Sequence, residues 1–436
     1  GQILVDAGEE AHVRLILAGV SLHDAMAPLY IVSADKVVLT LADGTENSVT
    51  DSVSYVFADV EDEPDAAIFS KEDLTINGKG ALSVTGNYAD GIVSKDDLKI
   101  VSGTIRVNAV HNGIKGKDSL SVRDGVIDVS AGNDAMKASH DSEEDRGWVI
   151  FEGGDTTITA GDDAIHAETW LLVYGGTIAV AKSYEGLEAM KIEVYGGDVS
   201  VVSADDAINA ASGSSDDFGG FGGWNFGGFG GFGGQGGFSM PNPSTSGTDA
   251  PPSEGTDSLF GGRGGGGRGN GGGGFGGGGF GEEPEDGVWI LIAGGTVRAQ
   301  GGNDILDTNG TFTQTGGTVI AVGTNMSIYG EPDAIIDTNG SAEVTGGTFA
   351  ALCRGTGSRF AGILSSPAVA CSSLNSAETV TLAEADGNAL VSFENGTRAQ
   401  NVVITSDQMT AGQDYLLILD GRTIAFTAEN GVQAIR

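Results

Sequence analysis

The chain is poor in positive charge, in cysteine and in long apolar runs, and each shortage excludes a class of protein. It has 22 lysines and arginines against 60 aspartates and glutamates, which gives a net charge of −38. Nucleic-acid binding is therefore excluded as a default, because it needs a basic face to displace counterions. No run of about 18 apolar residues is present, so no membrane span is expected. Two cysteines exclude a disulfide-dense scaffold, and the five histidines lack the spacing of a zinc site.

Glycine, by contrast, is abundant and unevenly spread. Of the 74 glycines, 31 lie in residues 213–281, where they alternate with phenylalanine in FGG units. Such a composition is typical of a low-complexity segment. Two interpretations remain open for it. It is either a disordered surface excursion or an assembly segment whose phenylalanines pack against a neighbouring molecule.

Outside this segment the sequence repeats. Short runs with Val, Ile, Thr or an aromatic residue at every second position predict strands, and helical periodicity is scarce. Between these runs recurs a box that consists of an acid or Asn, then Gly or Ala, then an apolar residue. The apolar member falls at positions 92, 114, 136, 165, 187 and 208, and the one long step contains the polar loop 140–146. A nearly constant step of this size indicates a repeat architecture.

The length and content of the repeat select the fold class. Two or three short strands and no helix exclude leucine-rich, ankyrin and TPR units, and propeller blades are about twice as long. We therefore predict an all-β protein, a right-handed parallel β-helix with one repeat per coil. The predicted parts are the first section of the β-helix (1–212), the glycine-rich insertion (213–286), the last coils (287–354) and a small C-terminal β cap (355–436).

Equivalent residues of successive coils stand above one another in such a solenoid, so the boxes place one acid or amide per coil in a column. Carboxylates stacked about 5 Å apart repel each other unless a cation neutralises them. Ca²⁺ suits this arrangement because it takes six to eight oxygen ligands in loose geometry. The predicted calcium ligands are Asp90, Asn133, Asp134, Asp162, Asp163, Glu185, Glu188, Asp205, Asp206 and Asn209. For a single Asp-Gly box, ordinary turn chemistry is the alternative, whereas the doubled acids favour a cation.

Three basic residues occupy the position three residues beyond the box acid. They are Lys115, Lys137 and His166, and we consider them candidates for ligand binding. Two alternatives stay open for the lysines, which could balance the neighbouring acids or act as the base of an elimination reaction. Cys353 and Cys371 are separated by nearly one repeat, which predicts a disulfide or a stacked thiol pair.

Several segments resemble the carbohydrate-binding β-helix family of clostridial and related cell surfaces, which is similar to family 9 polysaccharide lyases. They read GQILVDAGEEAHVRLILAGVSL, AIFSKEDLTINGKGALSV, DGIVSKDDLKIVSGTIRVNA and DDAINAAS, and the glycine-rich segment after DDAINAAS fits as well. The resemblance implies calcium in the turn column and binding of acidic plant polysaccharide such as polygalacturonate, and of cellulose, without clear lyase activity. It also implies an extracellular protein at the cell surface.

Three functions follow as hypotheses. The first is a secreted, calcium-dependent polysaccharide-binding protein. The second is a structural subunit of an extracellular filament that self-associates through its β-helix ends, because residues 2–5 already read as a strand with no cap before them. The third is a calcium-dependent pectate lyase, in which Lys115 or Lys137 would be the base.

Overall fold

The computed structural model describes residues 1–57, 63–212, 283–323, 327–329, 334–353, 362–372, 374, 377–397 and 399–436. Positions 213–282 of the predicted insertion, and with them both interpretations of its phenylalanines, lie outside the described residues. The described part contains strands and no α-helix. Accordingly, no helix in it has the length and apolar character needed to cross a membrane.

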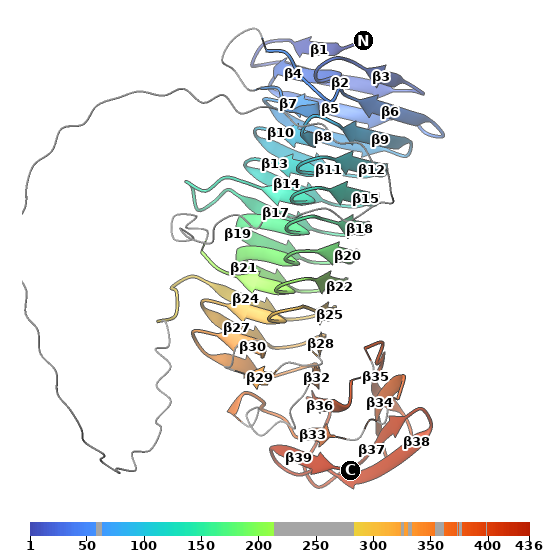
Figure 1. Cartoon of the computed structure of the whole chain (residues 1–436), viewed down its shortest axis with the longest axis vertical. Coiled ribbons are helices and arrows are strands. Elements are labelled where there is room, and N and C mark those ends of the chain that lie inside the picture. Colours follow the sequence, from blue (N-terminus) through green and yellow to red (C-terminus); the bar gives the residue numbers. More distant parts are fainter. Residues whose placement is uncertain are drawn as a thin grey trace, which may run out of the picture. The chain divides into compact units, whose positions relative to one another are not determined.

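Successive coils of three strands stack in chain order (Figure 1). One such coil consists of β10 (Asp90–Ser94), β11 (Asp97–Ile100) and β12 (Thr104–Ala109). Each of these strands pairs in parallel with its counterpart in the next coil. This pairing confirms the predicted all-β fold and parallel β-helix.

The strands form three faces. The first face contains β1 (Ile3–Asp6), β4 (Leu29–Ser33), β7 (Ala66–Ser70), β10, β13 (Ile114–Gly116), β16 (Met136–Ala138), β19 (Ile165–Val173), β21 (Leu187–Val194), β23 (Ile208–Ala210), β26 (Leu306–Thr308) and β30 (Ala334–Thr338), with β29 (Ser327–Tyr329) beside β30. The second face contains β2 (His12–Leu17), β5 (Lys36–Leu41), β8 (Asp73–Gly78), β11, β14 (Ser119–Val122), β17 (Trp148–Phe151), the later parts of β19 and β21, β24 (Trp289–Ile292), β27 (Thr311–Gln314) and β31 (Ala342–Val344). The third face contains β3 (Ser21–His23), β6 (Glu46–Thr50), β9 (Ala81–Gly86), β12, β15 (Val126–Ala131), β18 (Asp155–Thr159), β20 (Thr177–Ser183), β22 (Asp198–Ser203), β25 (Thr296–Gln300), β28 (Thr318–Val322) and β32 (Thr348–Cys353).

The alternating sequence pattern separates the interior of each coil from its surface. In β12, Ile105 and Val107 are buried, whereas Thr104, Arg106 and Asn108 are exposed. The inward residues of successive coils pack into one continuous apolar cluster. Side chains on the outer surface are therefore free to form columns of their own, because the register of the coils fixes which residues stand above one another.

Glycine forms the corner between the second and third faces. Gly176 and Gly197 have φ angles of 89° and 84°, in the region that residues with a side chain rarely adopt. A Cβ atom on Gly197 would also lie 2.7 Å from the carbonyl oxygen of Gly176 in the coil before. The Gly-Gly pairs that interrupt the apolar runs in the sequence are thus the tight corners of the solenoid.

The C-terminal segment ends the parallel ladder. β36 (Asn401–Ser406) pairs antiparallel with β32, and β33 (Ala368–Cys371) lies between β36 and β39 (Val432–Ile435). A separate antiparallel sheet contains β34 (Thr379–Glu384), β35 (Ala389–Glu394), β37 (Asp414–Leu419) and β38 (Arg422–Thr427). β36 covers the edge that β32 would otherwise expose.

The two cysteines lie on strands that are not neighbours. Cys353 ends β32 and Cys371 ends β33, and β36 runs between these two strands. Both cysteines are buried and no disulfide joins them. The disulfide that the sequence spacing suggested is therefore absent from this structure.

Candidate functional site

The box acids form the predicted column at the turn that precedes the first face. The residue after each box acid donates its backbone N–H to the box residue of the next coil, as Gly186 does to the carbonyl oxygen of Asp206 at 3.0 Å. The same bond joins Ala207 to Asp304 at 3.0 Å, across the insertion. The column therefore consists of Asp90, Asn112, Asp134, Asp163, Glu185, Asp206 and Asp304. Asp304 was not among the predicted ligands.

At the start of the column the polar groups satisfy one another. Asp90 is 2 % exposed and accepts hydrogen bonds from the backbone N–H of Asn112 at 2.9 Å and from Nδ1 of His111 at 2.8 Å. Asn133 donates from Nδ2 to Oδ1 of Asn112 at 3.0 Å. These bonds fit the turn-chemistry alternative for this part of the column. Metal binding by Asp90 and Asn133 stays a prediction.

A second column runs beside the first on the first face. Strand register aligns Lys115, Lys137, His166, Glu188, Asn209, Asp307 and Asp337. The structure therefore brings together the three predicted basic residues and two of the predicted metal ligands. The column begins with cations and ends with carboxylates, so its charge changes sign along the stack.

The cationic part of this column meets the box acids in a group that we call the His166 cluster: Asp134, Lys137, Asp163, His166 and Glu188. Nζ of Lys137 donates to Oδ2 of Asp134 at 2.7 Å. Nδ1 of His166 lies 2.6 Å from Oε2 of Glu188 and 3.0 Å from Oδ2 of Asp163. Two half-buried cations thus lie within hydrogen-bond distance of three carboxylates.

In the His166 cluster, cationic side chains balance the neighbouring carboxylates without an added ion. Burial lowers the pKa of His166, but hydrogen bonds to Asp163, Glu168 and Glu188 outweigh burial and raise this pKa well above its ordinary value. The imidazole is therefore charged, and both ring nitrogens act as donors. Burial, reinforced by Glu188, raises the pKa of Asp163 to about 8. A metal ion at this position would have to displace the protons of His166.

The anionic part forms a different group, which we call the Asp307 cluster: Asp206, Asp304, Asp307 and Asp337. Carboxylate oxygens of the last three lie within 4.8 Å of one another. Burial, followed by repulsion from neighbouring carboxylates, raises the pKa of Asp307 to about 8. Within the described residues, no Lys, Arg or His forms an ion pair with Asp307 or Asp337.

Two predicted ligands add oxygens beside the Asp307 cluster. Asn209 stands in register with Asp307 and donates from Nδ2 to Oε2 of Glu185 at 3.0 Å. Its Oδ1 atom is buried and accepts no hydrogen bond from the described part of the chain. Burial raises the pKa of Glu185 to about 7. Carboxylate and amide oxygens of this kind are ligands for a hard cation such as Ca²⁺.

The remaining predicted ligands lie at the edge of these clusters. Asp162 is partly buried, and this burial raises its pKa. Asp205 lies near the hydroxyl of Tyr184 and raises the pKa of that hydroxyl. Oδ1 of Asp206 accepts the backbone N–H of Asp304 at 2.7 Å, so one of its oxygens already has a structural role.

A third column, on the outer surface of the second face, is aromatic. Register aligns Trp148, Trp170, Lys191 and Trp289, so three of the four tryptophans of the chain stand in one line. Nζ of Lys191 lies 4.5 Å from the ring centroid of Trp170 and 5.1 Å from that of Trp289, which is cation–π geometry.

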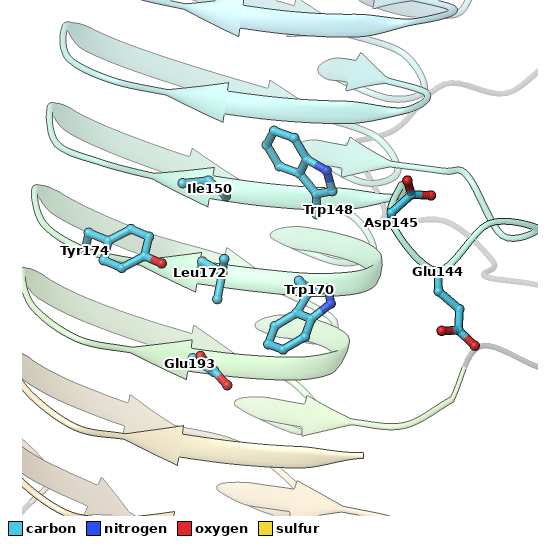
Figure 2. Close-up of a pocket in the computed structure, with 8 residues that line it drawn as sticks. All are labelled: Glu144, Asp145, Trp148, Ile150, Trp170, Leu172, Tyr174 and Glu193. Atoms are coloured by element: carbon cyan, nitrogen blue, oxygen red, sulfur yellow. The ribbon is translucent and has the colours of Figure 1, made fainter. Parts of the chain in front are cut away.

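A groove of about 340 Å³ opens over this face (Figure 2). Trp148, Trp170 and Tyr174 project around it, and Ile150 and Leu172 form its floor (Figure 2). Glu144 and Asp145, from the polar loop before β17, and Glu193 complete the lining.

The comparison with protein families decides the identity of the chain. A family model described as "Carbohydrate-binding domain-containing protein" matches residues 1–220. The chain belongs to this carbohydrate-binding family. The predicted family is thereby confirmed, and the match contains the His166 cluster, Trp148 and Trp170, whereas the Asp307 cluster gains three of its four members from beyond residue 220.

Individual relatives match shorter parts of the chain. A carbohydrate-binding domain-containing protein of Acetivibrio thermocellus is 48% identical over 111 residues, which are 25% of this chain and 39% of that protein. The chain thus spans about two fifths of the length of this relative. The solved structure of a polysaccharide lyase-like protein from C. thermocellum, a gadolinium derivative, has 39% identity and a TM-score of 0.39, and the match covers 49% of this chain and 81% of that one.

Sequence analysis of this family member missed the Asp307 cluster and the aromatic column. Both had a signal. Trp148 and Trp170 are one repeat apart, at the same step as most of the boxes. Asp304-Ile305-Leu306 stands in the place of a box but has Ile where the boxes have Gly or Ala, and the insertion hides the step that would have linked it to the column.

Proposed function

We propose that the protein is a secreted, cell-surface protein that binds acidic polysaccharide, such as polygalacturonate, through calcium. The carbohydrate-binding family supports the ligand class. The Asp307 cluster is the observation that carries the calcium requirement. It gathers buried and half-buried carboxylates, and Asp307 and Asp337 form no ion pair with a cationic side chain of the described residues.

Charge gives calcium a direct role in binding. A chain with a net charge of −38 repels a polyuronate, so a cation has to lie between them. Three carboxylates and the amide oxygen of Asn209 leave some of the six to eight positions of Ca²⁺ open. Asp307 and Asp337 are only half-buried, so these positions face solvent and can accept a uronate carboxylate.

Retention on immobilised polygalacturonate tests the proposal. We expect retention in calcium, loss in excess EDTA and recovery when calcium is restored. The Asp307→Asn, Asp337→Asn double variant removes two ligand charges and should lose retention. Asp198→Asn, which changes an exposed acid on the third face, is the control and should be retained like the parent. Full retention in excess EDTA would contradict the calcium requirement.

The lyase alternative needs a basic side chain that can accept a proton. Lys137 is a poor base, because Asp134 and other nearby carboxylates outweigh its burial and raise its pKa. We therefore expect no gain in the ultraviolet absorbance of unsaturated uronides during long incubation with polygalacturonate and calcium at alkaline pH. A gain that Lys115→Ala or Lys137→Ala abolished would establish elimination instead.

A further inference from the structure

We propose that the groove on the second face, between Trp148, Trp170 and Tyr174, is a second glycan site that takes an uncharged sugar chain and needs no calcium. The site is separate from the carboxylate columns, which lie at the turn before the first face and on that face. It goes beyond the calcium-dependent binding proposed above, and sugar binding in the groove does not depend on that function.

The groove presents aromatic rings to solvent. Tyr174 is 52% exposed, and the indoles of Trp148 and Trp170 are half-exposed. Exposed apolar surface of this kind marks a place of interaction. One side of a pyranose ring carries mainly C–H groups, and these polarised hydrogens pack against the electron-rich face of an aromatic ring. A sugar chain is therefore a fitting occupant.

Two of the three rings have partners that hold them in place before any ligand arrives: Trp170 packs edge-on against Trp289, and Tyr174 packs against Tyr195. Glu193 is 8% exposed and accepts hydrogen bonds from Nε1 of Trp289 at 2.9 Å and from the hydroxyl of Tyr195 at 2.6 Å. Tyr195 in turn stacks on Tyr174, with centroids 5.3 Å apart and planes at 8°. Binding to a preorganised surface costs less conformational entropy than binding to a mobile one.

The spacing of the rings also suits a polymer. Trp148 and Trp170 belong to neighbouring coils, and strands of a sheet lie about 4.8 Å apart. In an extended β-linked chain, successive sugars advance by a similar distance. A chain that runs along the stack can therefore place neighbouring sugars against successive coils.

Charge at the rim selects against uronates. Glu144 and Asp145 reach the groove from a loop that is fixed by Asp118, which lies 2.7 Å from Nδ1 of His140 and 2.6 Å from Nη1 of Arg146. Carboxylates accept hydrogen bonds from sugar hydroxyls but repel a second carboxylate. The groove thus favours an uncharged glycan over an acidic one.

Titration with cellohexaose in EDTA tests the site, with tryptophan fluorescence and calorimetry as readouts. We expect saturable binding without calcium. Trp170→Ala and Tyr174→Ala should each weaken it about ten-fold or more, as removal of an aromatic anchor does. Tyr184→Ala is the matched control, because Tyr184 is 49% exposed but lies outside the groove, and it should bind like the parent.

Several outcomes would overturn this site. One is that the parent protein does not bind cellohexaose, or binds it only when calcium is present. Another is that Tyr184→Ala loses as much affinity for cellohexaose as the groove variants do. Trp170→Phe keeps an aromatic ring and should recover most of the affinity, which separates a local role from misfolding. Retention of Trp170→Ala on polygalacturonate in calcium should match the parent, so failure of one site is distinguishable from failure of the other.

Discussion

The His166 cluster and the Asp307 cluster occupy the same two columns of the solenoid, yet they solve the problem of stacked carboxylates in different ways. In the first, Lys137 and His166 supply the positive charge from within the chain. In the second, the equivalent positions hold Asp307 and Asp337. The frame that presents the side chains is the same, so the sequence at one position per coil decides whether the counter-charge is internal or external.

Removing an internal cation from the His166 cluster should have the largest effect on stability. Lys137→Met leaves the carboxylate of Asp134, which is 2% exposed, without its cationic partner. Loss of one member of a buried pair costs about 3–5 kcal/mol, so we expect a loss of unfolding free energy in that range. Chemical denaturation measures it. Lys115→Met, one coil earlier in the same column, is the control, and an equal loss there would show that any lysine of the column matters alike.

Calcium should affect the other cluster. At a hundredfold excess over its Kd, a ligand that binds only the native state stabilises it by about 2.7 kcal/mol. The entropy of unfolding scales with length, so in a compact unit of this size the stabilisation corresponds to a rise in Tm of roughly 3–4 °C. Asp307→Asn combined with Asp337→Asn should lose most of the rise, whereas Glu188→Gln should keep it. A Tm that is indifferent to calcium in the parent protein would refute an external cation.

Converting one cluster into the other sharpens the contrast further. Asp307→Lys places in the anionic part the residue that Lys137 provides in the cationic part. We expect the calcium-induced rise in Tm to fall by at least half, because the lysine supplies the counter-charge. Asp198→Lys makes the same change of charge on the third face and should leave the rise intact.

The smallest expected effect is a pH dependence in the absence of calcium. The pKa of Asp307 is raised to about 8 in the folded protein, from an ordinary value of 3.8. The native state therefore holds a proton that the unfolded chain releases, and stability falls as pH rises from about 4 to 8. Asp307 is only half-buried, so solvent screening keeps the effect well below that of the full shift. Compared with Asp307→Asn, the parent should therefore lose roughly 1–3 °C more in Tm over this interval. Identical pH profiles for the two proteins would contradict the raised pKa.

Much of this frame was predictable from the sequence. The box spacing predicts the stack of coils, and the register places Asp134, Asp163, Glu185 and Asp206 in one column, as expected. Periodicity reveals such positions because each coil must return to the same corner.

The hydrogen-bond partners of these side chains were harder to predict, because they depend on the neighbouring coil rather than on residues close in the sequence. The bonds of His166 to Glu188 and Glu168 and the use of Asp90 as a hydrogen-bond acceptor appear only once the register is known. The tryptophan column was missed for a related reason. Folding does not constrain which residues face outward from a strand. A column of binding residues at these positions therefore looks like the ordinary alternation of a strand.

The corner between the first and second faces varies widely in length. β10 and β11 are joined there by residues 95–96 alone, and β19 crosses it as a continuous strand. The polar loop between β16 and β17, and the glycine-rich segment between β23 and β24, both enter at this same corner. β24 nevertheless pairs with β21 in unbroken register. The solenoid can therefore accept a foreign segment at that corner without disturbing its ladders, which makes the corner a natural graft point for new recognition surfaces.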